Sequence, residues 1–192
     1  MFEQSRIRLN KWFLKRALQK HRTLRSSISL DEARTIGLLV CATDESNLKA
    51  ALALAERLKK QKKEVEVLAF TGKAKSAETP SGYQTFGVKD LDWAFRPKAG
   101  VVTDFMARPF DLLFYFSHKS EPVLDYIMTL SAARFRVGPY VKTTEVCDLM
   151  VIPNKSDAKV FSDLMLFYLE KLNPGQSPAN TNKKEPNKAL AS

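Results

Sequence analysis

Basic side chains crowd the first 26 residues, where eight Lys or Arg stand against a single acid, Glu3. Ammonium and guanidinium groups neutralise phosphates, and an indole ring among them can stack on an exposed nucleobase. This chemistry depends on the density and the access of the groups rather than on fixed spacing. We predict that nine residues of the segment contact nucleic acid, with RNA or a ribonucleoprotein as the expected partner: Arg6, Arg8, Lys11, Trp12, Lys15, Arg16, Lys20, Arg22 and Arg25.

The distribution of charge sets this segment apart from the rest of the chain. The 192 residues have a net charge of +10, of which residues 1–26 carry +7 and residues 173–192 carry +2. Residues 27–172 keep only +1. A nearly neutral body with a strongly basic end indicates a scaffold that carries a binding segment. A non-enzymatic binding module is therefore the leading hypothesis.

Enzyme chemistry would need reactive groups at the ends of strands, because open α/β sheets bind their ligands there. Three such stretches, "CATDESN", "TGKAKS" and "FSHKSE", follow apolar runs. They make Asp44, Thr71 and His118 the candidates for a small-molecule or nucleotide site, which is an alternative function. Ser117 and His118 could supply a nucleophile and a base, but neighbouring residues of a strand point to opposite faces. We therefore predict no catalytic residue.

The sequence lacks the usual signatures of cofactors and metals. No glycine-rich turn follows the first apolar run, and Asp44 and Glu45 stand where a dinucleotide phosphate would approach the next helix. Cys41 and Cys147 lie far apart in apolar runs, without a CxxC pair or a histidine cluster. We predict no cofactor and no metal, and we expect both cysteines to be small core residues.

Helical periodicity gives the basic segment an apolar face as well. Four of the bases lie opposite a stripe that contains Leu9, Phe13, Leu14, Ala17, Leu18 and His21; these bases are Arg8, Lys11, Lys15 and Arg22. A basic amphipathic helix also suits an anionic membrane surface, so membrane-peripheral attachment through residues 1–26 stays open. A third reading stays open as well, in which the helix docks on its own domain and its bases are only solvated. Packing of this stripe on the domain would exclude its insertion into lipid. No run of 18 apolar residues and no secretory signal occur, so the cytoplasm is the expected location; the oligomeric state is left open.

Strand-like and helix-like segments alternate after the basic arm. Apolar runs predict strands at 35–42, 64–70, 83–86, 110–117, 134–138 and 147–153, and 3.6-residue periodicity predicts helices at 45–61, 121–133 and 156–172. This order predicts an α/β fold, a Rossmann-like three-layer sandwich with a mainly parallel sheet of five or six strands behind a basic amphipathic N-terminal helix. The expected parts are the arm (1–26), one α/β domain (35–172) and a disordered tail (173–192). Within the irregular middle, Trp93 is expected to close one edge of the core; the alternative is an exposed ring that stacks on a base.

Three segments, "TIGLLVCATDESNLKAALALAERLKKQKKEVEVLAF", "KDLDWAFRPK" and "FDLLFYFSHKSEPVLDYIMTLSAARFRVG", carry a resemblance. Together they resemble an uncharacterised family of small bacterial α/β proteins, a domain of unknown function, over most of Phe2–Leu172. Residues 110–138 also resemble the N-terminal, acceptor-side half of heptosyltransferase-type glycosyltransferases. Those enzymes have a strand that starts with Asp, a helix and then R-x-G, here Asp111, Arg136 and Gly138. The first resemblance implies the fold and no activity, and the second implies a related fold.

Overall fold

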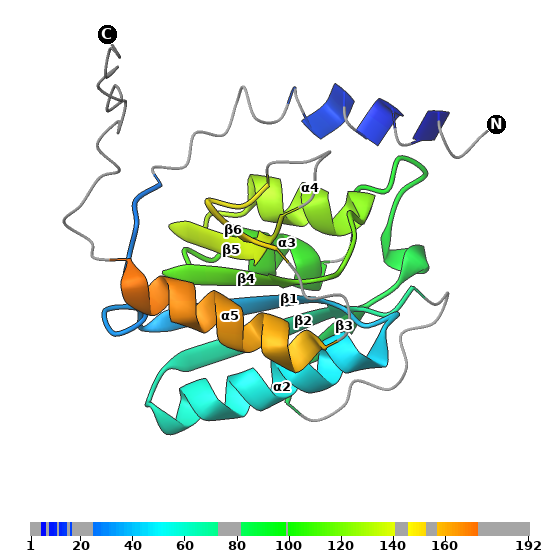
Figure 1. Cartoon of the computed structure of the whole chain (residues 1–192). Coiled ribbons are helices and arrows are strands. Elements are labelled where there is room, and N and C mark those ends of the chain that lie inside the picture. The colour runs from blue at the N-terminus through cyan, green and yellow to red at the C-terminus, as the bar shows by residue number, and fades with distance from the viewer. Residues whose placement is uncertain are drawn as a thin grey trace, which may run out of the picture.

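The computed structural model of the chain describes residues 5–6, 8–10, 12–14, 16, 25–72, 82–98, 100–140, 146–152 and 157–172. Its centre is a six-stranded, all-parallel sheet in the order β3-β2-β1-β4-β5-β6 (Figure 1). The elements are β1 (Thr35–Cys41), α2 (Glu45–Lys60), β2 (Glu64–Phe70), β3 (Gln84–Phe86), η1 (Val88–Asp90), α3 (Gly100–Ala107), β4 (Leu112–Phe116), α4 (Pro122–Leu130), β5 (Phe135–Pro139), β6 (Leu149–Val151) and α5 (Ala158–Lys171). The predicted α/β fold with a mainly parallel sheet is confirmed.

β1 occupies the middle of the sheet and pairs with β2 on one side and β4 on the other. It is buried from Ile36 to Cys41, which explains why its sequence is continuously apolar instead of alternating. Parallel neighbours require a crossover, and α2 provides it between β1 and β2. The helix begins where the sequence predicts, because the Asp44 side chain accepts a hydrogen bond from the backbone N–H of Ser46.

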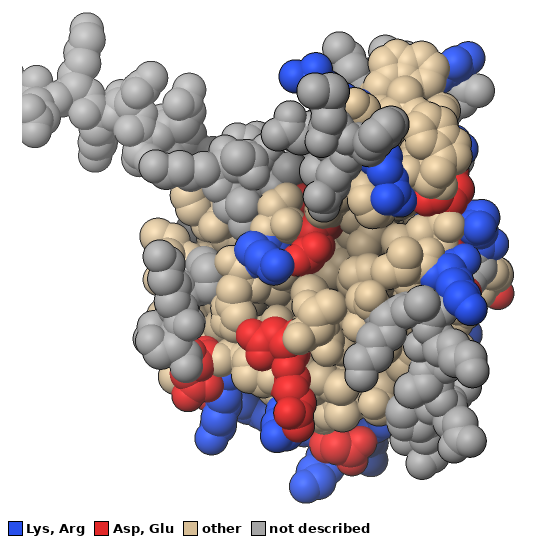
Figure 2. Space-filling view, turned by 90° about the vertical axis from the view of Figure 1, so that its right-hand side faces the viewer, with Lys and Arg blue, Asp and Glu red and all other residues tan. Residues whose placement is uncertain are grey.

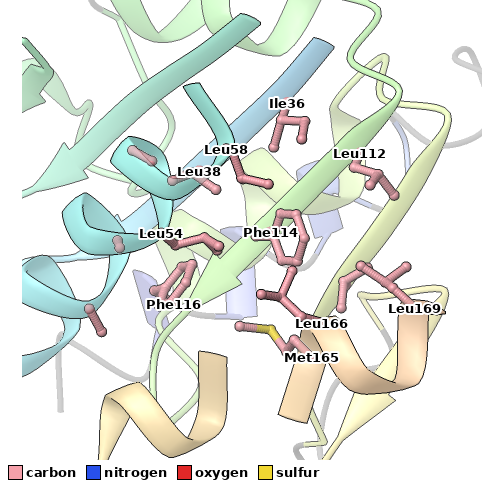
Figure 3. Close-up of a cluster of buried hydrophobic side chains, with 14 of the residues drawn as sticks. Ile36, Leu38, Leu54, Leu58, Leu112, Phe114, Phe116, Met165, Leu166 and Leu169 are labelled. Atoms are coloured by element: carbon pink, nitrogen blue, oxygen red, sulfur yellow. The ribbon is translucent and has the colours of Figure 1, made fainter. Parts of the chain in front are cut away.

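Alternate side chains of each strand enter two separate cores. On one face, Phe114 and Phe116 of β4 point toward Leu54 of α2 and Met165 of α5 (Figure 3). On the other face, a second cluster lies under α3 and α4, with Phe105 fully buried in it. The three-layer arrangement therefore follows from strands that are apolar on both sides.

The described residues between Ser5 and Arg16 are helical, and this N-terminal helix is drawn above α4 in Figure 1. The structure describes the chain again from Arg25 onward. Several predicted features lie outside the described residues: Lys11, Lys15, Lys20, Arg22 and the expected disordered tail at 173–192.

α3 occupies a region that the sequence predicts to be irregular. Its first residue is Gly100 and two valines follow, so its intrinsic helix propensity is low. Burial decides the outcome, because Val102 and Phe105 are fully buried against the sheet. Tertiary packing thus overrides a weak local signal.

Helical periodicity in the sequence predicts that the inward stripe of α5 consists of Phe161, Leu164, Met165, Tyr168 and Leu172, and this prediction is partly wrong. Phe161 and Met165 are buried as expected, but Tyr168 is 46% exposed and Leu169 takes its place in the core. The helix has apolar residues on two sides, so periodicity alone does not identify the inward one. Trp93 was also wrongly expected to close the core, because its side chain is 64% exposed.

Candidate nucleic-acid interface

The candidate nucleic-acid interface is built on a tight turn that precedes α3 in the chain. The Asp92 carboxylate accepts hydrogen bonds from the backbone N–H groups of Ala94 (2.8 Å) and Arg96 (2.9 Å) and from Nε of Arg96 (2.7 Å). Phe95, between them, has a φ of +59°, in the left-handed region that β-carbons disfavour. The carboxylate therefore holds the backbone of the turn in a conformation that its sequence alone would not favour.

The N-terminal helix docks on this turn through one of its faces. Nδ2 of the buried Asn10 donates to the Ala94 carbonyl at 2.8 Å. One turn earlier, Nε of Arg6 donates to the Trp93 carbonyl at 2.6 Å, and its guanidinium lies 4.0 Å from the centre of the Phe95 ring. These contacts join residues more than 80 positions apart, and sequence periodicity gives no sign of them.

The apolar stripe of the same helix also meets the body. The Arg96 guanidinium lies 3.9 Å from the centre of the Phe13 ring, a cation–π contact. Phe13, Leu14 and Leu9 are half-buried. The stripe that the sequence offers to a membrane is thus partly covered by the protein itself.

Arg25 forms a second anchor between the arm and the body. Its guanidinium donates to the carbonyls of Ala133 (3.0 Å), Thr129 (3.4 Å) and Ser131 (3.4 Å) and lies 3.7 Å from the Asp148 carboxylate. Burial and the neighbouring Arg136 lower the pKa of Arg25. Its contacts within the domain give Arg25 a structural role that its place in a basic segment does not indicate.

The outward face of the N-terminal helix keeps its basic and aromatic character. Arg8, Trp12 and Arg16 are exposed, and the Arg16 guanidinium lies 5.5 Å from the centre of the Trp12 ring. Ser5, Arg8, Leu9 and Trp12 line an open hollow of about 400 Å³. At the top of Figure 2, where this helix lies, basic side chains flank uncharged residues, whereas acidic side chains lie across the centre of the face.

The carboxyl ends of the strands form the alternative site. The strand order places the topological switch point between β1 and β4, where folds of this order bind nucleotides. Asp44 occupies the N-terminus of α2 there, and its hydrogen bonds from the hydroxyl (2.7 Å) and N–H (2.9 Å) of Ser46 lower the pKa of its carboxyl. An ionised carboxylate at this position repels the phosphate that a helix N-terminus would otherwise attract.

Two buried polar atoms lie beside this switch point without a hydrogen-bond partner among the described residues: Oδ1 of Asn47 and Nδ1 of His118. Nδ2 of Asn47 donates to the Cys41 carbonyl at 3.3 Å, which holds the amide at the end of β1. The centre of the His118 ring lies 6.3 Å from the centre of the Phe161 ring of α5. Sequence patterns single out His118 but not Asn47. Asn47 lies among the buried residues of α2, and helical periodicity does not distinguish it from them.

The residues after β4 do not assemble a nucleophile and its base. The Ser117 hydroxyl donates to the Lys119 carbonyl at 2.7 Å, and the Glu121 carboxylate pairs with the Lys119 ammonium at 3.0 Å. The Ser117 hydroxyl and the Glu121 carboxylate thus both contact Lys119, and neither forms a catalytic relay with His118. Behind them, Asp125 accepts hydrogen bonds from the Tyr115 and Ser120 hydroxyls, and burial raises the pKa of its carboxyl.

Both cysteines are free and buried, as predicted. Burial raises the pKa of Cys147 to about 12, so its thiol stays protonated at neutral pH. Burial also raises the pKa of Cys41, whose sulfur lies 3.0 Å from the Thr43 hydroxyl. Neither thiol has the depressed pKa of a nucleophile.

A hollow of about 400 Å³ lies at the opposite, amino ends of β1 and β2. It is lined by Thr35, Glu64, Glu66, Arg108 and Phe110 among others, and Arg108 pairs with Glu66 at 2.6 Å. Parallel sheets bind ligands at the other end of their strands, so size alone does not make this hollow a site.

Over the described residues, no group of three or more His, Cys, Asp or Glu side chains is placed to hold a metal ion. No helix in that part of the chain has the length and apolarity needed to cross a membrane.

The fold and the site together define a class of protein, an α/β domain in Rossmann strand order that carries a docked basic helix and lacks a phosphate-binding glycine loop. The chain belongs to DUF6913, a family of unknown function, whose model matches residues 6–172. This span runs from the N-terminal helix to the end of α5, so the family pattern includes both. A search of curated proteins found no match to the chain.

The resemblance of residues 110–138 to heptosyltransferase-type glycosyltransferases finds no support in these comparisons. Two residues that carry it have partners within the domain. The Asp111 carboxylate accepts from the N–H and the hydroxyl of Thr35, at 3.0 and 3.1 Å. Arg136 pairs with Asp148, from Nη2 at 2.8 Å and from Nε at 3.0 Å. These contacts give both residues a structural role.

Proposed function

We propose that this protein is a non-enzymatic module that binds nucleic acid, with RNA as its partner, through the outward face of the N-terminal helix. Arg8, Trp12 and Arg16 form this face, and Trp93 of the docking turn extends it. The observation that carries the proposal is the orientation of the helix. Asn10 faces the turn and is buried, so the basic and aromatic side faces solvent.

The exposed groups suit a single-stranded partner. Arg8 and Arg16 would neutralise phosphates, with release of counterions and no dependence on base sequence. Trp12 and Trp93, 51% and 64% exposed, each present an indole on which a base can stack. The remaining bases of the segment, Lys11, Lys15, Lys20 and Arg22, would add phosphate contacts. A cytoplasmic location accompanies this proposal because RNA is abundant there.

The contacts of the helix favour RNA over a membrane surface. Phe13 is covered by Arg96 and Leu14 is half-buried, so these side chains are not presented to the acyl region of a bilayer. The basic side could still meet lipid headgroups, but the apolar contribution that strengthens such binding would be small. Liposomes therefore belong in the test as the competing partner.

Tryptophan fluorescence provides a direct test, because the chain has two tryptophans and both lie on the proposed surface. Stacking on a base should quench their emission. We expect single-stranded RNA to quench the full-length protein at low salt. Trp12→Phe and Trp93→Phe variants should each retain part of the quenching, since each keeps one stacking indole.

The same titration with anionic liposomes separates the two partners. Insertion of Trp12 into lipid would shift its emission to shorter wavelength, and this shift would persist at high salt. Such a shift without quenching by RNA would contradict the proposal. A variant with Arg8→Ala and Arg16→Ala should bind RNA more weakly, and a variant with Lys59→Ala and Lys60→Ala, on the last turn of α2, controls for the same loss of charge elsewhere.

A small-molecule site at the switch point is the second candidate, favoured by Oδ1 of Asn47 and Nδ1 of His118, which have no hydrogen-bond partner in the described part of the chain. Asn47 Oδ1 needs a donor, so the ligand class is a hydroxylated or amine compound rather than a phosphate. Thermal unfolding with a panel of nucleosides, sugars and amines tests this candidate. A rise in Tm that His118→Ala abolishes would support it, and an unchanged Tm across the panel would argue against it.

A further inference from the structure

α5 has a second apolar face, of which only Leu164, which is partly buried, packs against the core of the domain. Phe161, Met165 and Leu169 point into the core on one side (Figure 3 labels the last two). A different stripe, spaced four, seven and eight residues from its first member, lies on the other side of the helix: Val160, Leu164, Phe167 and Tyr168. Phe167 is 50% exposed, and in Figure 1 no described helix or strand lies in front of α5.

The stripe continues onto the edge of the sheet. β6 is the last strand and pairs only with β5 among the described strands. A groove of about 340 Å³ runs between it and α5, lined by Met150, Val151, Ile152, Leu164 and Tyr168. Ile152 is 75% exposed at this edge. Contiguous exposed apolar side chains on a helix and the neighbouring strand are typical of a protein interface.

We propose that this surface binds a second copy of this chain around a two-fold axis that passes by Leu164, with the two α5 helices antiparallel. A two-fold interface must be self-complementary, so residues equally spaced on either side of the axis meet each other. Leu164 then faces Leu164 of the second copy. Val160 faces Tyr168 of the second copy, because each is four residues from the axis.

The charges at the ends of the stripe fit this arrangement. Asp157 and Lys171 each lie seven residues from Leu164, on opposite sides of it, and both are exposed. The Lys171 ammonium lies 5.6 Å from the centre of the Phe167 ring, which places it on the stripe. Antiparallel helices therefore bring Asp157 opposite Lys171 of the second copy at both ends, whereas parallel helices would oppose like charges.

A cysteine at the axis tests both the association and its register in the full-length chain. Leu164→Cys places a thiol opposite its own copy, and mild oxidation should give a disulfide-linked dimer on a non-reducing gel. Val160→Cys is the matched control on the same stripe. Two copies of position 160 would lie about 12 Å apart along the direction of the helices, too far for a disulfide. Linkage of Val160→Cys in place of Leu164→Cys would overturn the proposed register.

Sedimentation velocity over a range of concentrations measures the dimer without cross-linking. We expect Lys171→Glu, which opposes two acids, to weaken the dimer at least tenfold, and Phe167→Ser with Tyr168→Ser to make the chain monomeric. Circular dichroism should show that these exposed changes leave the fold intact. A wild-type chain that stays monomeric, or a dimer that these substitutions leave unchanged, would overturn the proposal. RNA binding uses the N-terminal helix, so neither result affects it.

Discussion

At the scale of single residues, Asp92 shows how one side chain builds the platform for the N-terminal helix. Burial alone would raise the pKa of its carboxyl, but the hydrogen bonds from Arg96 and Ala94 outweigh burial and hold that pKa below its ordinary value. The fold therefore stabilises the ionised form. A depressed carboxyl pKa contributes stability that is fully present above the pKa of the unfolded chain and is lost as pH falls through the folded pKa.

Asp92→Asn should lower the free energy of unfolding by about 1 kcal/mol at pH 7. The reason is that the charged carboxylate, which accepts hydrogen bonds from three donors, is replaced by a neutral amide. Below about pH 4, the ordinary pKa of an aspartate, the difference between the two proteins should shrink. Urea unfolding between pH 7 and pH 3 measures this. A difference that stays constant across the range would show that ionised Asp92 does not stabilise the fold.

Arg25 tests which bases of the arm are structural. Arg25→Ala removes donors to the carbonyls at and just after the end of α4, and it removes one of the two arginines that pair with Asp148, so it should cost about 2 kcal/mol of stability. Arg8→Ala, on the exposed side of the N-terminal helix, should leave stability unchanged. Urea unfolding compares the two variants, and equal losses would contradict the assigned roles.

At the scale of elements, β5 lies too close to its neighbours to accept a larger residue at Gly138. A β-carbon there would lie 2.7 Å from the Cys147 sulfur and 2.8 Å from the Tyr115 β-carbon. Gly138→Ala should therefore destabilise the domain by about 1–3 kcal/mol through overpacking. Gly100→Ala is the control, since nothing lies within 4 Å of its β-carbon. Thermal unfolding that ranks the two variants equally would argue against this crowding.

The sequence predicts the strands better than the inward faces of the helices. β1 and β2 begin at the predicted residues, because a buried parallel strand is a continuous apolar run bounded by polar residues. α5 begins and ends close to its prediction, but its apolar residues form two stripes, and only packing against α2 and the sheet chooses between them. α3 has a weak local signal and is formed by burial.

The candidate site is predictable to a similar extent. Density of charge identifies the basic segment, and Arg8, Trp12 and Arg16 are exposed there. The roles of Asn10 and Arg25 come from contacts with residues 84 and more positions away, which local periodicity does not encode. A pairing of acid and base at positions 92 and 96 is visible in the sequence, but it does not reveal that the resulting turn receives the helix.

At the scale of the whole molecule, most of the positive charge lies in a different part of the chain from the α/β domain. Residues 1–26 carry +7 and residues 27–172 carry +1, and the N-terminal helix is held against the domain by contacts at both Asn10 and Arg6. A docked basic helix presents its charges in a fixed orientation, so less conformational entropy is lost when a partner binds. In the proposed function, the body would therefore support one charged face.

The salt dependence of RNA binding tests this separation most directly. For single strands, the slope of log K against log salt concentration changes by about 0.7 for each phosphate contact. A variant with Arg8→Ala and Arg16→Ala should therefore reduce the slope by about 1.4 relative to the full-length wild type. The Lys59→Ala, Lys60→Ala variant loses the same charge from α2 and should keep the wild-type slope. Equal slopes for both variants, or no binding of RNA by the wild type at low salt, would contradict the assignment of the N-terminal helix as the binding surface.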